Sequence, residues 1–164
     1  YDSSVVEHHS WNNQTARRLL GTFWSAVAGG AYAMWGSFAT YEVGDPMWGL
    51  LDSTVPERLR IMHDFITRFP YWEMAPANEA VSANEVEIEG ARYRTNYCLA
   101  KPGERYLVFS LHGGALTLAL QPGVGYHLIH LDPRTGEERE LGEVDGGVQS
   151  VTLPAKEQVL LATV

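Results

Sequence analysis

The stretch Tyr126-His-Leu-Ile-His-Leu-Asp-Pro-Arg-Thr-Gly-Glu137 is a short, mostly apolar run that ends in turn-forming residues. Pro133 presets the φ angle that a tight turn needs, and Gly136 accepts its left-handed position. The stretch therefore predicts a strand over residues 126–132 that is closed by a hairpin turn.

Similar short runs lie on both sides of this stretch and are separated by Gly and Pro. Glu85, Glu87 and Glu89 alternate with Val86 and Ile88, which is typical of a strand with one wet and one buried face. The predicted strands are residues 85–88, 92–100, 105–110, 115–120, 126–132, 138–144, 149–153 and 158–164. So many short strands over about 80 residues predict an antiparallel β-sandwich.

The part before Pro76 has a different character, because all the tryptophans lie there and its apolar residues follow helical spacing. It predicts strands at residues 4–6 and 31–35 and helices at residues 14–28 and 54–69. Strands that alternate with helices imply a parallel, helix-covered sheet, which two strands alone cannot build. We therefore divide the chain into residues 1–76 and residues 77–164, and we expect the first part to belong to something larger. Taken as one unit, the chain would be an α+β protein.

A carboxylate directly follows the first predicted strand. Glu7 would lie at the carboxyl end of that strand, where (β/α) barrels build their active sites. Trp35 occupies the equivalent end of the next strand and offers an apolar face to a sugar ring. Side chains able to hydrogen-bond to or stack on a polyhydroxylated ligand follow Glu7, namely His8, His9, Trp11 and Asn12. A solvated loop carboxylate is the alternative interpretation of Glu7.

The sequence offers no pattern for a metal or another cofactor, and we expect neither. His8 and His9 are adjacent, so on an extended chain they point to opposite sides and do not easily ligate one ion. Cys98 lies inside a predicted strand, where a small buried hydrophobic residue is expected rather than a nucleophile.

Charge and hydropathy exclude two classes of partner. The net charge of −8, with only Lys101 and Lys156 as lysines, argues against binding to nucleic acid. No apolar run approaches the roughly 18 residues of a membrane span, so we expect no membrane partner.

Several motifs carry a family resemblance. They are Arg18-x5-Trp24-x3-Ala28-Gly29-Gly30-Ala31-Tyr32-x2-Trp35-Gly36, Trp48-x2-Leu51, Pro70-Tyr71-Trp72-x3-Pro76, and the strand and turn quoted first. The chain from Glu7 onward resembles the end of the DUF4038 group of bacterial glycoside hydrolases, which have apiosidase-like (β/α)8 catalytic domains. The residues from Tyr126 to Glu137 are similar to the W-x-D-P-R-T-G-E segment of the small sandwich that follows that barrel, a domain that carries a collagen-binding label. His130 departs from the usual aromatic residue, and the end of the chain lacks the usual Asp-Trp.

The resemblance implies an α/β barrel fragment, the last two βα units of a TIM barrel, followed by an all-β antiparallel sandwich. Glu7 then matches the nucleophile at the end of barrel strand seven. A retaining mechanism needs a second carboxyl about 5–5.5 Å away as acid/base. In the family it ends strand four, which this chain lacks, so the chain alone would be incomplete as an enzyme.

The implied activity is hydrolysis of a plant or bacterial polysaccharide or oligosaccharide by a secreted or periplasmic enzyme. The Tyr1 start then suggests a cut through a larger protein, with the rest of the barrel supplied by a separate chain or by further copies of this one. Two alternatives stay open. The chain is a non-catalytic carbohydrate-binding or structural β-sandwich module, or it is an unrelated, complete α+β protein.

Overall fold

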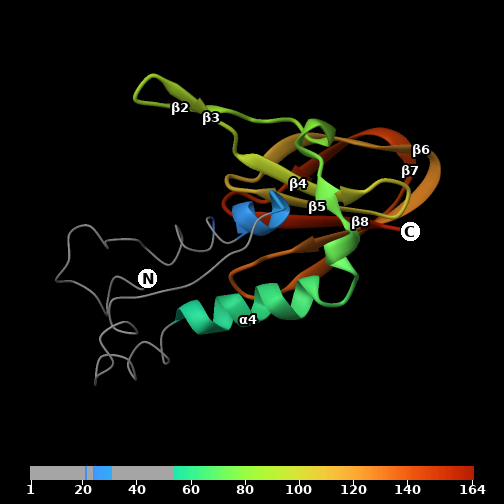
Figure 1. The fold of residues 1–164 in the computed structure, drawn as a ribbon, viewed down its shortest axis with the longest axis horizontal. Coiled ribbons are helices and arrows are strands. Elements are labelled where there is room, and N and C mark those ends of the chain that lie inside the picture. The colour runs from blue at the N-terminus through green and yellow to red at the C-terminus, as the bar shows by residue number, and fades with distance from the viewer. Residues whose placement is uncertain (1–20, 22–23, 31–53) are drawn as a thin grey trace.

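The computed structural model describes Gly21, residues 24–30 and residues 54–164 (Figure 1). Its main element is an antiparallel sheet of six strands. Across the sheet the order is β1 (Ala75–Pro76), β4 (Asn96–Lys101), β5 (Arg105–Ser110), β8 (Gln158–Thr163), β6 (Gly114–Leu131) and β7 (Glu138–Leu153). The predicted antiparallel β architecture is therefore found, whereas the predicted barrel strands at residues 4–6 and 31–35 lie outside the described residues.

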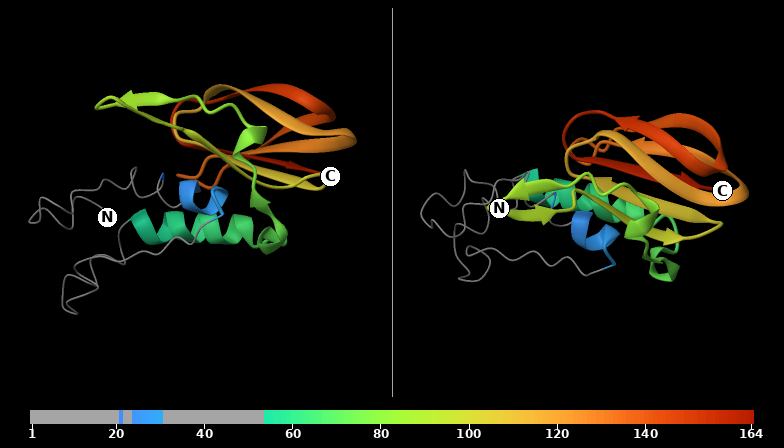
Figure 2. Two further views of the ribbon diagram at one scale, coloured as in Figure 1. Left: turned by 45° about the horizontal axis from the view of Figure 1, so that its top comes forward. Right: turned by 90° about the horizontal axis from the view of Figure 1, so that it is seen from above.

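β6 and β7 are each one long strand where the sequence predicted two, so the expected breaks at residues 121–125 and 145–148 are wrong. The pairing of β6 with β7 shifts register between Leu120 and Gly125 but continues on both sides. Gly123 and Gly147 have φ of +81° and +118° there, so the backbone bends without leaving the ladder. Figure 2 shows the resulting ribbon arching over the rest of the sheet, which fits a sandwich made by one folded sheet.

A small hairpin, β2 (Val86–Ile88) paired with β3 (Ala91–Tyr93), stands apart from this sheet (Figure 1). The predicted continuous strand over residues 92–100 is wrong, because Arg94 and Thr95 belong to no strand and separate β3 from β4. The Thr95 N–H donates to the Ala83 carbonyl at 3.0 Å, and Arg94 Nη1 donates to the Asn78 carbonyl at 2.7 Å. These bonds replace the ladder that a continuous strand would need.

Each of the two described α-helices ends at residues that locally favour a turn. α4 (Thr54–Ile66) stops three residues before the predicted end, at a turn in which Thr67 Oγ1 donates to the His63 carbonyl at 2.8 Å. The helix at residues 24–28 stops at Gly29 and Gly30, as predicted, with Gly30 at φ +76°. Two short 3₁₀ turns follow, η2 (Tyr71–Glu73) and η3 (Asn78–Ala80). Within residues 24–30 and 54–164, no helix combines the length and apolar character of a membrane span.

β4, β5 and β8 are buried on both faces, because each face packs into a different core. One core joins the sheet to the helices and contains Trp24, Ala28, Ile61, Met62, Phe65, Ile66, Phe69, Met74, Leu99, Leu107, Phe109, Leu131, Val159 and Leu161. The other lies under the β6–β7 ribbon and includes Cys98, Val108, Leu118, Tyr126 and Leu160. The first core contains residues from before and after position 76, while the predicted division into residues 1–76 and 77–164 stays a prediction.

Candidate functional site

The six residues predicted to act on a ligand are not among those that the structure describes. Glu7, His8, His9, Trp11, Asn12 and Trp35 all lie outside the described residues. What the structure does describe is the segment that follows each predicted strand, namely residues 24–30 after the first and α4 after the second.

Trp24 fixes the first of these helices to the sheet. Its side chain is fully buried, and its ring stacks on Phe109 of β5 with a centroid distance of 6.4 Å and an interplanar angle of 11°. Phe65 of α4 meets the same indole edge-on at 6.3 Å. Trp24 therefore lies between α4 and the sheet, and the three rings tie both helices to β5.

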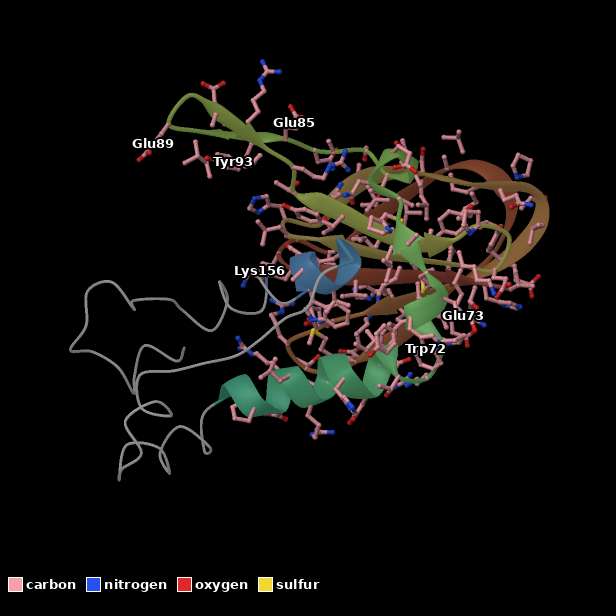
Figure 3. The ribbon with its side chains drawn as sticks, viewed as in Figure 1. Trp72, Glu73, Glu85, Glu89, Tyr93 and Lys156 are labelled. Atoms are coloured by element: carbon pink, nitrogen blue, oxygen red, sulfur yellow. The ribbon has the colours of Figure 1, made fainter. Side chains whose placement is uncertain are left out.

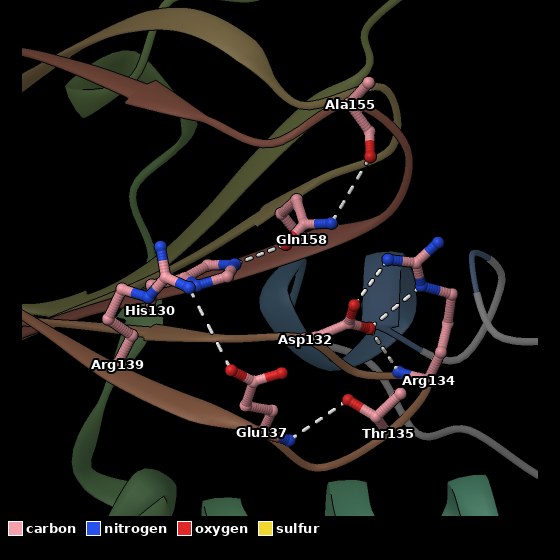
Figure 4. A network of polar contacts seen from close by, with 8 residues as sticks. All are labelled: His130, Asp132, Arg134, Thr135, Glu137, Arg139, Ala155 and Gln158. Atoms are coloured by element: carbon pink, nitrogen blue, oxygen red, sulfur yellow. Dashed lines mark hydrogen bonds and ion pairs between the residues drawn. The ribbon is translucent and has the colours of Figure 1, made fainter.

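The turn that the sequence predicted at residues 132–136 is confirmed, and it contacts α4. The Asp132 carboxylate accepts bonds from the Arg134 backbone N–H and from Arg134 Nε, both at 2.9 Å (Figure 4). Burial tends to raise the pKa of Asp132, but the bonds from Arg134 outweigh it and hold this pKa below its usual value. Gly136, at φ +77°, approaches Ile61 so closely that an added Cβ would lie 3.3 Å from its side chain.

A hollow of about 190 Å³ opens between α4 and this turn. Its charged lining groups are paired. Arg68 bonds to Glu138 at 2.7 Å, and Arg60 bonds to Asp64 at 3.0 Å. The bond to Glu138 raises the pKa of Arg68, so this guanidinium stays charged. Because these charges satisfy one another, the hollow has the character of a packing groove rather than a catalytic cleft.

Other candidate groups are accounted for by packing. Cys98 is fully buried, and burial raises the pKa of its thiol to about 12, as expected for an inert side chain. His130 is buried and hydrogen-bonds to Gln158, whereas His127, on the opposite face of β6, is exposed and lies 3.7 Å from Glu143. Among the described residues, no group of His, Cys, Asp or Glu has the arrangement of a metal site.

Sequence reasoning missed the exposure of Trp72. Its side chain is 71% exposed, and the sequence distinguishes it only as part of the family-like motif. Its position between Pro70 and Pro76, after the end of the apolar stripe of α4, was the available signal that it leaves the core.

Comparisons with known proteins place this fold. No family model matches the chain, and no curated protein matches it. A solved structure named glycoside hydrolase matches with a TM-score of 0.72 and 14% identity, over 94% of this chain and 38% of that one. A glycoside hydrolase family 5 structure from Bacteroides vulgatus matches with a TM-score of 0.73 and 15% identity, over 94% and 38%.

The chain therefore has a glycoside hydrolase-like fold and spans 38% of the length of these neighbours. The expected resemblance is supported at this coarser level. The narrower resemblance to the DUF4038 and apiosidase-like group, and the collagen-binding label of its sandwich, stay predictions.

Proposed function

We propose that this chain is the C-terminal portion of a glycoside hydrolase that acts on a plant or bacterial polysaccharide or oligosaccharide. The likeness of 94% of the chain to part of two glycoside hydrolase structures is the observation that carries the proposal. The described helices pack on one face of the sheet. This arrangement fits the end of a barrel that packs against a sandwich.

In the proposed mechanism Glu7 is the nucleophile of a retaining reaction. Its carboxylate attacks the anomeric carbon and forms a glycosyl-enzyme ester, while an acid/base carboxyl about 5–5.5 Å away protonates the leaving oxygen. That second carboxyl then deprotonates the water that hydrolyses the ester. It comes from the rest of the barrel, whether in the same polypeptide, a separate chain or another copy.

The remaining predicted residues would bind the substrate. Trp11 and Trp35 would stack on sugar rings, and His8, His9 and Asn12 would hydrogen-bond to hydroxyl groups. The proposed site uses no metal or other cofactor. Secretion or a periplasmic location belongs to the same proposal, because polymeric substrates are met outside the cytoplasm.

Mechanism-based trapping tests the proposal. The full-length product of the gene that encodes this chain is incubated with activated 2-deoxy-2-fluoro glycosides, and the adduct is located by peptide mass spectrometry. We expect a covalent adduct on Glu7 and loss of both adduct and aryl-glycoside turnover in Glu7→Gln. Glu57→Gln, a change of an exposed carboxylate on α4, is the matched control. Turnover in Glu7→Gln equal to that of the control would remove Glu7 from the mechanism.

One observation favours a second candidate, a non-catalytic module. β4, β5 and β8 are buried on both faces, which leaves no open face for a ligand there and would suit a structural support. If the full-length product hydrolyses no glycoside and forms no adduct while it folds normally, the structural or carbohydrate-binding role replaces the enzymatic one.

A further inference from the structure

Trp72 is an aromatic side chain in an unusual place. Tryptophan is highly buried in most proteins, yet this one is 71% exposed and lies beyond the end of α4. Figure 3 shows it beside Glu73, well away from Tyr93 and Glu89 of the β2–β3 hairpin. An exposed indole of this kind is a surface on which a ligand with an apolar face can stack.

The ring is held on a rigid support. η2 is fixed by backbone bonds from Tyr71 N–H to the Phe69 carbonyl at 2.7 Å and from Met74 N–H to the Tyr71 carbonyl at 3.1 Å. Tyr71 meets the indole edge-on, with centroids 5.5 Å apart at 75°. Met74, buried in the core beneath the sheet, anchors the end of the turn. A ligand that stacks on Trp72 therefore orders little of the protein, which favours binding.

Charged groups of both signs continue from this ring across the surface. Glu73 accepts a bond from Lys101 Nζ at 2.8 Å, and Lys101 also bonds to Glu104 at 2.7 Å. Arg105 Nη1 lies 3.7 Å from Glu104. The bond from Lys101 holds the pKa of Glu73 below its usual value, so the carboxylate stays ionised. The cluster has two positive and two negative groups and no net charge.

This combination selects the kind of ligand. The balanced charges give no attraction for a polyanion or a polycation, but they supply donors and acceptors for hydroxyl groups. Among the other exposed large apolar side chains of the described residues, Val164 belongs to the residue whose N–H donates to the Glu104 carbonyl at 3.1 Å, and the rest lie on the hairpin and on β7. The apolar surface near η2 is therefore small for a stable protein interface, which buries roughly 800 Å² per partner.

We propose that Trp72, with Glu73 and Lys101, forms a surface binding site for a neutral sugar chain, outside the proposed catalytic site. The indole packs against the C–H face of one pyranose ring, and the Glu73 carboxylate and Lys101 ammonium bond to its hydroxyl groups. The site goes beyond the proposed hydrolase activity and does not depend on it, because neither Glu7 nor the rest of a barrel takes part.

Affinity gel electrophoresis of this 164-residue chain tests the site. Gels contain a neutral glycan (xyloglucan, mixed-linkage β-glucan or galactomannan) or, for comparison, anionic polygalacturonate. We expect retardation by at least one neutral glycan and none by polygalacturonate. Trp72→Ala should weaken binding by about tenfold or more, and Trp72→Phe should retain part of it. Tyr93→Ala, which removes the 52% exposed ring of the hairpin, is the matched control and should bind like the wild type.

Melting curves establish that Trp72→Ala still folds, since removing an exposed side chain should shift Tm by only about 2 °C. Equal retardation of the wild type and Trp72→Ala would overturn the proposal, as would no retardation on any glycan. A concentration-dependent dimer of the wild type that Trp72→Ala abolishes would show instead that the ring contacts protein. In the full-length product, Trp72→Ala should still form the covalent adduct on Glu7, so failure of this site and failure of the proposed catalysis are separate results.

Discussion

Replacing Phe65 with alanine tests whether α4 and the sheet share one core. The Phe65 side chain is 2% exposed, and its ring lies 6.3 Å from Trp24 and 6.2 Å from Phe69. The Arg68 guanidinium covers it at 5.2 Å. Removing a buried phenylalanine ring costs about 3–5 kcal/mol of unfolding free energy, and the lost ring contacts place this site in the middle of that range. We expect a loss of about 4 kcal/mol.

Urea and thermal unfolding followed by far-UV circular dichroism measure this loss. A change of about 4 kcal/mol corresponds to a Tm lower by about 8–16 °C in a chain of this size. His63→Ala is the matched control, because His63 lies on the same helix with its side chain 71% exposed, and the change should stay within about 0.5 kcal/mol. Since Trp24 and Phe109 belong to the same core, helix and sheet should unfold in one transition.

Two results would refute this reasoning. One is a loss in Phe65→Ala no larger than that of His63→Ala. The other is a pair of separate transitions in which only the first moves. The second result would mean that the predicted boundary after residue 76 separates units that fold independently, and that the contact between them contributes little free energy.

Three further predictions follow from single contacts. Cys98, fully buried with its pKa raised to about 12, should not react with Ellman's reagent at pH 8 until urea unfolds the chain. Gly113→Ala should cost more than about 3 kcal/mol in urea unfolding, because its Cβ would lie 1.7 Å from a carbonyl oxygen; Gly90→Ala, with similar positive φ but open space, should cost about 1 kcal/mol. Because Arg134 keeps the pKa of Asp132 below 3.8, that pair should stabilise the fold above about pH 4 and lose its effect as pH falls through the lowered pKa, so Asp132→Asn should flatten the acid limb of a stability–pH curve. Reaction of Cys98 in the folded chain would contradict the first prediction. Equal costs of Gly113→Ala and Gly90→Ala would contradict the second, and an unchanged acid limb in Asp132→Asn would contradict the third.

Local signals predicted the elements that depend on neighbouring residues. The strand at residues 105–110 has the predicted bounds, and the turn at residues 132–136 forms as the positions of Pro133 and Gly136 predict. The helix stop at Gly29 and Gly30 is correct for the same reason. In each case the conformational preference of one or two residues is enough.

The continuity of β6 and β7 could not be predicted in this way. Pro122-Gly123 and Gly146-Gly147 are typical turn pairs, and nothing local distinguishes a turn from a bend inside a ladder. The difference lies in the partner strand. Gly146 sits so close to Gln121 that an added Cβ would lie 1.9 Å from its carbonyl oxygen. Two glycine-rich bends therefore fit against each other, a contact between positions 25 residues apart.

The exposed face of the hairpin shows the same limit. Alternation at residues 85–89 predicted one buried face, but Ile88 and Tyr93 are 55% and 52% exposed. Val86 pairs with Tyr93 and Ile88 with Ala91, so the apolar side chains share one side of the hairpin as the period of two requires. The pattern fixes which residues share a face, whereas burial depends on what that face meets.

The prediction of Glu7 as a site residue depends on the prediction of a strand end. A carboxylate that directly follows a short predicted strand is the signal for Glu7, and in the proposed function its partner carboxyl comes from a distant barrel strand. No spacing within these 164 residues encodes that pairing. Trp72 was missed because periodicity identifies the residues that point into a core more readily than those that point away from it.

The sheet has a consequence for the proposed reaction. In that proposal the helix at residues 24–28 and α4 follow the two barrel strands that carry Glu7 and Trp35. These helices are fixed by the Trp24–Phe109 stack and by the contact of Gly136 with Ile61, so the sheet sets their positions. Two carboxyls that must stand about 5 Å apart tolerate little movement, because a displacement of about 1 Å can cost 100-fold in rate. Residues such as Phe109 would then act as positioning residues, and their loss should lower kcat more than it raises KM.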